Sequence, residues 1–311
     1  MNRSKIIFTV CTNNYLAQAS VLAKSVKDIA PDYTFYLFLA DEFNGDINYT
    51  ALENINFINW QTLPIDCNDL KDKFDVIELS TAIKASCFKY LFATFSPEIV
   101  HYLDPDIKLF SSLDKLDSYF ENSSILLTPH IHSPIKPQEG SPNENLFLRH
   151  GLYNLGYLGL KKSAVSDKAL DWWEDRCLTM GFNNPKYGFF VDQLWMNYIP
   201  IFYPKETHIM LDMGYNMGPW NLHERSLNFK DSAFLVNGNS PLVFYHFSSY
   251  KYNQHEISKH YRYTFASNPD VKPIYDSYRK EMIEAGVEKF EKFKWAYTKK
   301  KTFLKKIIKR K

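Results

Sequence analysis

The chain has 311 residues, of which 45% are hydrophobic and 16% aromatic, so it can bury the core of one large domain or of two small ones. Its four cysteines are far apart and include no Cys-x-x-Cys pair, which argues against a zinc clamp or a redox centre and favours a reducing compartment. The sequence contains no stretch of 18 apolar residues and no signal-like segment, so we expect neither secretion nor a membrane span.

The small net charge of +2 conceals an acidic body and a basic C-terminus. Residues 289–311 hold eleven of the 37 lysines and arginines and one of the 35 acidic residues. The other 26 basic and 34 acidic residues give residues 1–288 a net charge of −8. An acidic body argues against nucleic-acid binding by the fold, and we expect no nucleic-acid partner.

Strand and helix patterns alternate from the N-terminus. Residues 5–12 form an apolar run typical of a buried strand, and apolar side chains from Tyr15 onwards recur at helical spacing until Pro31. Residues 35–40 form a second apolar run. This order predicts an α/β fold with a mostly parallel sheet, and such sheets bind ligands at the carboxyl ends of their strands.

The next part of the chain leads to an acidic pair. A weaker strand at 55–60 and a helix at 80–95 precede a strand that we expect to remain extended through Asp104, Pro105 and Asp106. In an extended chain, side chains two positions apart lie on one face. A lone Asp-x-Asp is most often a solvated turn, but the apolar run before this one favours a site for a hard cation.

The later segments are more varied. In chain order, we expect a short helix at 112–120, a strand at 124–128, a mobile loop over a site at 129–145, a close backbone approach at the glycine-rich residues 151–160, helices at 168–177 and 189–198, and a strand at 242–247. The helix at 189–198 carries Asp192 and Gln193, and the last strand delivers His246. We expect one domain over 1–265 and a helical extension over 266–311.

Five segments, in this order and spacing, resemble the GT-A glycosyltransferases and, within them, family 8, which uses nucleotide-diphospho-sugars. The segments are Val10-Cys11-Thr12-Asn13-Asn14-Tyr15 with the later Ala23-Lys24-Ser25-Val26, Tyr102-Leu103-Asp104-Pro105-Asp106, Tyr153-Asn154-Leu155-Gly156, Val191-Asp192-Gln193 and His246-Phe247. The resemblance covers most of residues 5–255 and implies the GT-A fold, a Rossmann-like sheet with flanking helices.

The resemblance implies that Asp104, Asp106 and His246 bind a divalent cation, Mn²⁺ or Mg²⁺, across the two phosphates of the donor. Such a cation neutralises the negative charge that builds on the β-phosphate as the sugar leaves. Without the resemblance, His246 between two aromatic residues would be interpreted as a core histidine.

The resemblance also implies that Thr12, Asn14 and Tyr15 hold the nucleoside of a UDP-sugar, and that a basic residue, Lys84 or Lys89, faces the donor. From the residues alone, the same loop is also explained as an ordinary strand-to-helix turn with an asparagine as the N-cap. Most lysines on helices are simply solvated.

Asn154, Asp192 and Gln193 match positions that touch the transferred sugar, and Asp192 is best suited to hold its hydroxyl groups. After the metal histidine, family 8 members usually have a glycine and a Lys-Pro-Trp, whereas His246 is followed here by Phe-Ser-Ser-Tyr-Lys, so Lys251 would take the phosphate contact. The chain would then belong to a sister family. Family 8 retains the anomeric configuration, but in an inverting enzyme Asp192 would be the base.

Together, these features predict a cytoplasmic, metal-dependent hexosyltransferase that moves galactose or glucose, with retention, from UDP to a surface polysaccharide or a lipid-linked glycan. Two alternatives remain. A non-catalytic nucleotide-sugar binding module would be expected to lack one metal ligand. A sugar nucleotidyltransferase would be expected to carry a glycine-rich loop after the first strand, where residues 12–15 contain no glycine.

The basic C-terminus also has an apolar pattern. Between Phe290 and Ile308, large apolar residues fall mostly at helical spacing among the lysines. This composition is typical of a helix that lies among lipid headgroups, so we expect residues 289–311 to hold the protein peripherally at the anionic inner face of the cell membrane. A solvated terminus or a basic arm for nucleic acid would explain the charge but not the apolar residues.

Overall fold

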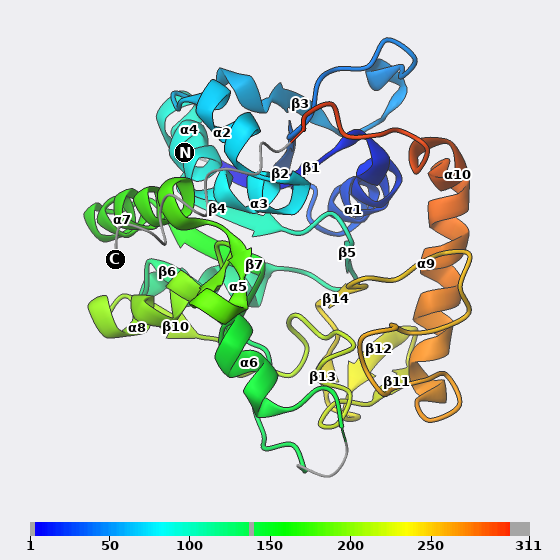
Figure 1. Ribbon diagram of the computed structural model, residues 1–311. Coiled ribbons are helices and arrows are strands. Elements are labelled where there is room, and N and C mark those ends of the chain that lie inside the picture. The colour runs from blue at the N-terminus through cyan, green and yellow to red at the C-terminus, as the bar shows by residue number, and fades with distance from the viewer. Residues whose placement is uncertain (1–3, 137–139, 299–311) are drawn as a thin grey trace.

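The computed structural model describes residues 4–136 and 140–298 and is built on a seven-stranded sheet (Figure 1). The strand order is β10-β6-β7-β4-β1-β2-β3, and neighbouring strands are parallel except where β7 pairs with β4 and β6. The expected α/β fold with a mostly parallel sheet is confirmed. The strands are β1 (Lys5–Cys11), β2 (Tyr33–Leu39), β3 (Asn56–Asn59), β4 (Ile99–Leu103), β6 (Ile125–Pro129), β7 (Tyr153–Lys161) and β10 (Thr207–Ile209).

Each face of the sheet has its own hydrophobic core. Ile7 of β1 belongs to the core under α1 (Leu16–Ile29), α9 (Lys272–Glu284) and α10 (Val287–Phe290). Its neighbours in sequence, Ile6 and Phe8, belong to the core under α4 (Lys84–Phe95) and α7 (Ala164–Met180). Because helices cover both faces of the sheet (Figure 1), β1 is apolar on both sides, and its residues form a continuous hydrophobic run in the sequence.

Hydrogen bonds from side chains at the N-terminus fix the first residue of two of the helices. Ser163 and Ser166 cap α7, which therefore starts before the expected residue 168. Asp75 and Glu78 form a capping box at α3 (Val76–Ala82), so the helix expected at 80–95 is in fact two helices, α3 and α4, that meet at Ile83. The other α-helices of the described residues are α2 (Cys67–Lys73), α5 (Asp114–Ser118), α6 (Glu144–His150) and α8 (Ile199–Phe202).

The helix expected over 189–198 is wrong. The chain there forms the two-residue strand β9 (Phe189–Phe190), then a turn, then a 3-10 helix. Val191 has a φ of 41°, in the left-handed region, which an α-helix cannot contain. A tertiary hydrogen bond holds the turn, since Trp173 Nε1 donates to the carbonyl oxygen of Asp192 at 3.1 Å. Tertiary contacts have overridden the local apolar pattern.

The glycine-rich residues 151–160 include most of β7, the antiparallel strand inside the sheet. A Cβ on Gly159 would lie 2.4 Å from the hydroxyl oxygen of Tyr157 and 3.0 Å from His101 Nδ1. The expected close approach to the backbone is therefore confirmed, and the approaching groups at Gly159 are buried side chains of the protein itself.

The described parts of 129–145 make hydrogen bonds to the body of the protein, and the mobility that we expected for this loop stays a prediction. The Glu224 carboxylate accepts hydrogen bonds from the backbone N–H groups of residues 132–133. Arg262 donates to backbone carbonyl groups within residues 140–142. Both described ends of the segment are anchored in this way.

Within residues 4–136 and 140–298, three smaller sheets accompany the large one. They are β5 (Ile107–Leu109) with β14 (Phe244–His246), β11 (Leu227–Lys230) with β12 (Ala233–Val236) and β13 (Ser240–Pro241), and β8 (Asn183–Asn184) with β9. The first of these joins the segment after the acidic pair to the strand that carries His246.

The described C-terminal residues, up to 298, fold back on the body, whereas we expected an amphipathic helix from Phe290 onwards. Helix α10 ends at Phe290, residues 291–298 are not helical, and Phe293 and Tyr297 pack against the two cores. The rest of the expected interfacial helix, 299–311, lies outside the described residues. In the part of the chain that is described, no helix combines the length and apolar character needed to cross a bilayer.

Candidate active site

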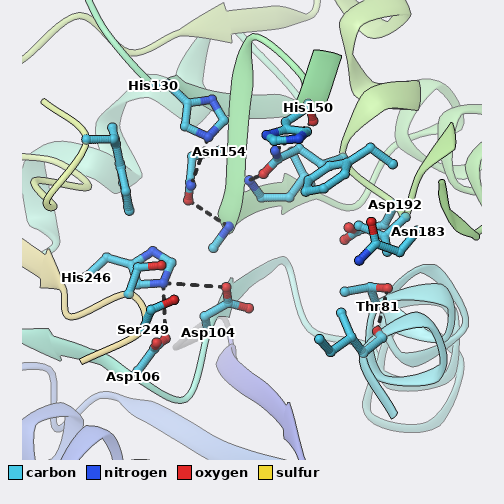
Figure 2. Close-up of a pocket in the computed structure, with 18 of the residues that line it drawn as sticks. Thr81, Asp104, Asp106, His130, His150, Asn154, Asn183, Asp192, His246 and Ser249 are labelled. Atoms are coloured by element: carbon cyan, nitrogen blue, oxygen red, sulfur yellow. Dashed lines mark hydrogen bonds and ion pairs between the residues drawn. The ribbon is translucent and has the colours of Figure 1, made fainter. Parts of the chain in front are cut away.

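A short ladder brings together residues from the middle and the end of the chain. β5 pairs with β14 so that His246 lies opposite Ile107, and the N–H of Phe247 donates to the carbonyl oxygen of Asp106 at 2.9 Å. His246 Nε2 lies 3.0 Å from Asp106 Oδ1 and 3.7 Å from Asp104 Oδ2. One ligand atom from each of these three residues lies within 4.8 Å of the others (Figure 2).

The acidic pair lies in a turn, not in the extended chain that we expected. β4 ends at Leu103, and the N–H of Ile107 donates to the carbonyl oxygen of Asp104 at 3.0 Å. Asp104 itself stays attached to the sheet, because its N–H donates to the carbonyl oxygen of Gly156 and its carboxylate accepts from the Tyr102 hydroxyl. The turn, and not strand alternation, makes the two carboxylates converge.

The three residues fit a divalent cation. Two carboxylates and an imidazole form a donor set that suits Mn²⁺ and is tolerated by Mg²⁺. Nδ1 of His246 is buried and has no hydrogen-bond partner among the described residues, so neither ring nitrogen is committed to a group outside this cluster. A Cβ on Gly156 would lie 2.4 Å from His246 Cε1, so glycine is what leaves room for the imidazole.

The electrostatics of the cluster favour positive charge. Burial lowers the pKa of His246, but the charges of Asp106 and Asp104 outweigh burial and raise the pKa above its ordinary value. Burial raises the pKa of Asp106, but the charge of His246 and its hydrogen bond outweigh burial and lower the pKa. The carboxylates therefore already attract positive charge to the place where a cation would bind.

Lys84, and not Lys89, reaches the site. Lys84 is buried, and its Nζ lies 3.4 Å from Asp104 Oδ1 and 3.0 Å from Asp192 Oδ2 and donates to the carbonyl oxygen of Leu155 at 2.9 Å. Burial lowers the pKa of Lys84, but the two carboxylates outweigh it and raise the pKa, so the ammonium stays charged. Lys89 instead pairs with acidic residues of α7.

A cavity of about 420 Å³ beside the acidic pair gathers the residues that we expected to bind the nucleotide. Thr12, Asn14 and Tyr15, at the carboxyl end of β1, line it together with the acidic pair, Lys84 and Lys251. The ends of β1 and β4 therefore open on one space, as parallel strands with neighbouring carboxyl ends require.

The loop after β1 is not held by an asparagine N-cap. No side-chain hydrogen bond caps the 3-10 turn Asn13–Tyr15 or helix α1. The Thr12 hydroxyl donates to Asn14 Oδ1 at 2.5 Å. The Asn13 side chain points inward, where it donates to the carbonyl oxygen of Glu42 and accepts from the Tyr49 hydroxyl. The simple N-cap explanation of this loop is therefore wrong.

A second cavity, of about 380 Å³, shares the acidic pair with the first and is lined by Asn154, Asp192 and Gln193. Figure 2 shows Asn154 above His246 and Asp192 across the cavity from both. Asp192 is buried, and burial raises the pKa of its carboxyl group against the opposing effect of Lys84. Apart from Lys89, the alternative to Lys84, the structure therefore brings every sequence-predicted site residue to one or both of two adjoining cavities.

Asn154 and Gln193 are held by the protein itself. Gln193 Oε1 accepts from the N–H of Leu155 at 3.0 Å, and its Nε2 donates to the carbonyl oxygen of His150 at 2.8 Å. Asn154 Oδ1 accepts from the N–H of Gly156 at 3.0 Å. Both amides therefore shape the cavity wall around β7 in addition to facing the cavity.

Sequence reasoning missed several residues of the second cavity. His130 lines this cavity, and its Nε2 lies 3.2 Å from Asn154 Nδ2. Asn216 is buried outside the lining and donates to Asn154 Oδ1 at 3.1 Å. The ring of Trp220 packs edge-on against the imidazole of His246, with centroids 5.1 Å apart. The aromatic and polar stretch 215–225 was visible in the sequence, but its lack of periodicity did not indicate where its side chains would point.

The sheet, the acidic pair at the end of a central strand and the late histidine define a GT-A-like fold. The galactosyltransferase LgtC, solved with donor and acceptor sugar analogues, matches with a TM-score of 0.52 and 15% identity over 90% of this chain and 95% of LgtC. The bifunctional glycosyltransferase WbbM matches with a TM-score of 0.56 and 13% identity over 94% of this chain and 52% of WbbM. The glycosyltransferase GlyE of Streptococcus pneumoniae TIGR4 matches with a TM-score of 0.50 and 12% identity over 95% of this chain and 66% of GlyE. At these identities the likeness is one of fold.

Two curated proteins of Bacillus subtilis (strain 168) are similar in sequence. The uncharacterized protein YfnF is 26% identical over 285 residues, which cover 89% of this chain and 92% of YfnF. The uncharacterized protein YfnD is 21% identical over 280 residues, which cover 87% of this chain and 86% of YfnD. No protein-family model matches the chain, so the resemblance to family 8 stays a prediction.

Proposed function

We propose that this protein is a metal-dependent glycosyltransferase that moves a hexose, galactose or glucose, from a UDP-sugar to a surface polysaccharide or lipid-linked glycan. The observation that carries the proposal is the cluster of Asp104, Asp106 and His246 at the junction of two cavities. One cavity suits a nucleoside diphosphate and the other a sugar and its acceptor. Both cavities are lined by the acidic pair that follows β4, and ligands bind at the carboxyl ends of strands in such sheets, which supports the proposal.

Asp104, Asp106 and His246 would hold Mn²⁺ or Mg²⁺, which when bound supplies positive charge to the diphosphate leaving group. Thr12, Asn14 and Tyr15 would hold the uridine beside the acidic pair. Lys251 lines the same cavity and carries a charge that suits a phosphate. These roles follow from where the side chains lie in the first cavity.

Asp192 and Lys84 would act together on the sugar. Lys84 neutralises Asp192 across 3.0 Å and keeps the carboxylate oriented, so that it accepts hydrogen bonds from sugar hydroxyl groups. Retention of the anomeric configuration is proposed on the resemblance to family 8; in an inverting enzyme Asp192, whose pKa burial raises, would be the base. Asn154 and Gln193 would complete the wall that the sugar touches.

The decisive experiment is a donor screen. UDP-galactose, UDP-glucose and UDP are titrated into the protein by calorimetry with and without Mn²⁺, and UDP release is then followed with saccharide acceptors. We expect binding that requires the cation and a product whose anomeric configuration, read by NMR, matches the donor. Cation-dependent binding without turnover on any acceptor would favour the alternative of a non-catalytic nucleotide-sugar module. Release of pyrophosphate from UTP and a sugar phosphate would favour a nucleotidyltransferase.

We also propose that the basic residues beyond Thr298 bring this activity to the anionic inner face of the membrane. The packing of Phe293 and Tyr297 on the body limits this contact to 299–311, where eight lysines or arginines accompany Phe303, Leu304 and two isoleucines.

A further inference from the structure

A C-terminal segment lies beside the loop that follows β1. After α10 the chain runs back along the end of the sheet (Figure 1), and residues 295–297 make three hydrogen bonds there. Trp295 Nε1 donates to the carbonyl oxygen of Ala40 at 3.0 Å, and the Tyr297 hydroxyl accepts from Trp60 Nε1 at 3.1 Å. We call residues 295–297 the C-terminal brace.

The third hydrogen bond reaches Asp41, which links the brace to the β1 loop. Asp41 Oδ1 accepts from the N–H of Ala296 at 3.0 Å and from the N–H of Glu42 at 2.9 Å. Asp41 Oδ2 accepts from the N–H of Asn13 at 3.3 Å. One carboxylate therefore receives a donor from the C-terminus of the described chain and another from the middle of the loop Thr12–Tyr15.

The environment of Asp41 makes this link structurally important. Asp41 is 1% exposed, and a buried carboxylate is tolerated only where hydrogen-bond donors replace its water. Three backbone N–H groups provide that replacement. Removing the donor of Ala296 would leave one oxygen underpaired, and the carboxylate would move toward water and pull away from Asn13.

The other side of the loop is also held by the C-terminal region. Helix α10 packs against the 3-10 turn Asn13–Tyr15. Its residues Val287 and Phe290 are buried in the core that includes Leu16 and Ala17 of α1. The loop is therefore supported between α10 and the Asp41 junction, both of which depend on residues after 286.

We propose that Asp41 is a positioning residue for nucleotide binding, and that the C-terminal brace keeps it in place. This inference rests on the proposed use of Thr12, Asn14 and Tyr15 for the nucleoside. Asp41 acts through Asn13, whose backbone sets the directions in which the flanking side chains enter the cavity. Loosening the brace raises the KM for the donor and leaves turnover at saturation nearly unchanged, because the hydrogen bonds and ion pairs of Asn154, Asp192 and Gln193 within the described residues go to groups other than Asp41 and Asn13.

The test uses full-length variants. Ala296→Pro removes the N–H that Asp41 accepts, and Asp41→Asn replaces the charged acceptor by a neutral amide. Tyr252→Phe is the matched control, since it removes a hydrogen bond from the same C-terminal segment at Glu291, away from Asp41. We measure UDP affinity by calorimetry with Mn²⁺, and hydrogen exchange of residues 12–16 by mass spectrometry without ligand.

We expect Ala296→Pro and Asp41→Asn each to weaken UDP binding by about tenfold, the effect of losing one charge-assisted hydrogen bond, and to accelerate exchange at 12–16. Tyr252→Phe should match the wild-type protein in both measurements. If Ala296→Pro does not fold, Trp295→Phe loosens the brace at the neighbouring residue, since it removes the donor to Ala40 and keeps an aromatic ring in place.

Two outcomes overturn the proposal. Wild-type exchange at 12–16 in the brace variants shows that the brace does not support the loop, whether or not UDP binds. Faster exchange with unchanged UDP affinity shows that the loop is supported but does not position the nucleotide. If the wild-type protein does not bind UDP at all, the proposed function fails, and faster exchange in the variants then shows a brace that serves a different ligand or none.

Discussion

His246 Nε2 lies 3.0 Å from Asp106 Oδ1, although the two residues come from opposite halves of the chain. The pairing of β5 with β14 is what makes them neighbours. Because the two side chains offer ligand atoms to the same proposed cation, replacing either one should have the same effect, which is the first prediction.

Asp106→Asn and His246→Ala should each lower transfer activity by at least about a hundredfold, since each removes a ligand of the proposed cation, which would stabilise the leaving group. The measurement is UDP release at saturating donor and Mn²⁺, with circular dichroism to show that the fold persists. Asp114→Asn, an exposed acid on α5, is the control and should behave as the wild-type protein. Normal turnover in Asp106→Asn would disprove the metal assignment.

Gly156→Ala should weaken Mn²⁺ binding by about tenfold or more. The added Cβ would meet His246 Cε1 at 2.4 Å and Nδ1 at 2.5 Å, so the imidazole must move away from the carboxylates. Gly45→Ala is a matched control, because no atom lies within 4 Å of its added Cβ. Mn²⁺ affinity can be read by electron paramagnetic resonance of the free ion, and an unchanged affinity in Gly156→Ala would contradict the role given to His246.

Stability should fall as the pH drops below about 6.5, in part because of His130. This residue is 6% exposed, and burial lowers the pKa of its imidazole to about 3, from 6.5 in the unfolded chain. The unfolded chain therefore binds the proton first as the pH falls. The stabilising contribution of neutral His130 is complete above pH 6.5 and is lost progressively toward pH 3, by about 2 kcal/mol at pH 5.

Urea unfolding at pH 7 and pH 5 checks this expectation. His130→Gln keeps a polar side chain without a titrating group, so its free energy of unfolding should change less between the two pH values than that of the wild-type protein. Parallel pH dependence of the two proteins would show that His130 is not the group responsible.

Truncation after Thr298 should abolish co-sedimentation with anionic vesicles and leave UDP binding unchanged. The removed residues hold eight lysines or arginines, each of which contributes about 1 kcal/mol at such a surface. The cut is placed there because Phe290, Phe293 and Tyr297 pack on the body, so an earlier cut would also damage the fold. Full vesicle binding by the truncated protein would refute the membrane role of the tail.

Sequence patterns were sufficient for the elements whose signal is local. The apolar runs that became β1, β2 and β4, and the helical spacing that became α1, are properties of short windows. Their alternation along the chain was enough to predict a mostly parallel α/β sheet, because parallel neighbours need a crossover between them. The acidic pair was found for the same reason, as it directly follows a recognisable strand.

Only the tertiary structure decided where the chain is held by distant partners. Val191 takes a left-handed backbone and Asp192 leaves the expected helix because Trp173 and Lys84 bind that turn from other elements. The sequence alone does not distinguish Lys84 from Lys89, since both lie on α4. Only Lys84 lies on the face of α4 that turns inward, so only its ammonium group reaches the site.

The C-terminus shows the same limit. Its apolar residues at helical spacing were compatible with an amphipathic helix from Phe290 onwards, but Asp41, Ala40 and Trp60 offer hydrogen-bond partners that a free helix would not have. Local spacing describes which face a segment could bury. What it buries against depends on groups that lie far away in the chain, and folding alone brings those groups together.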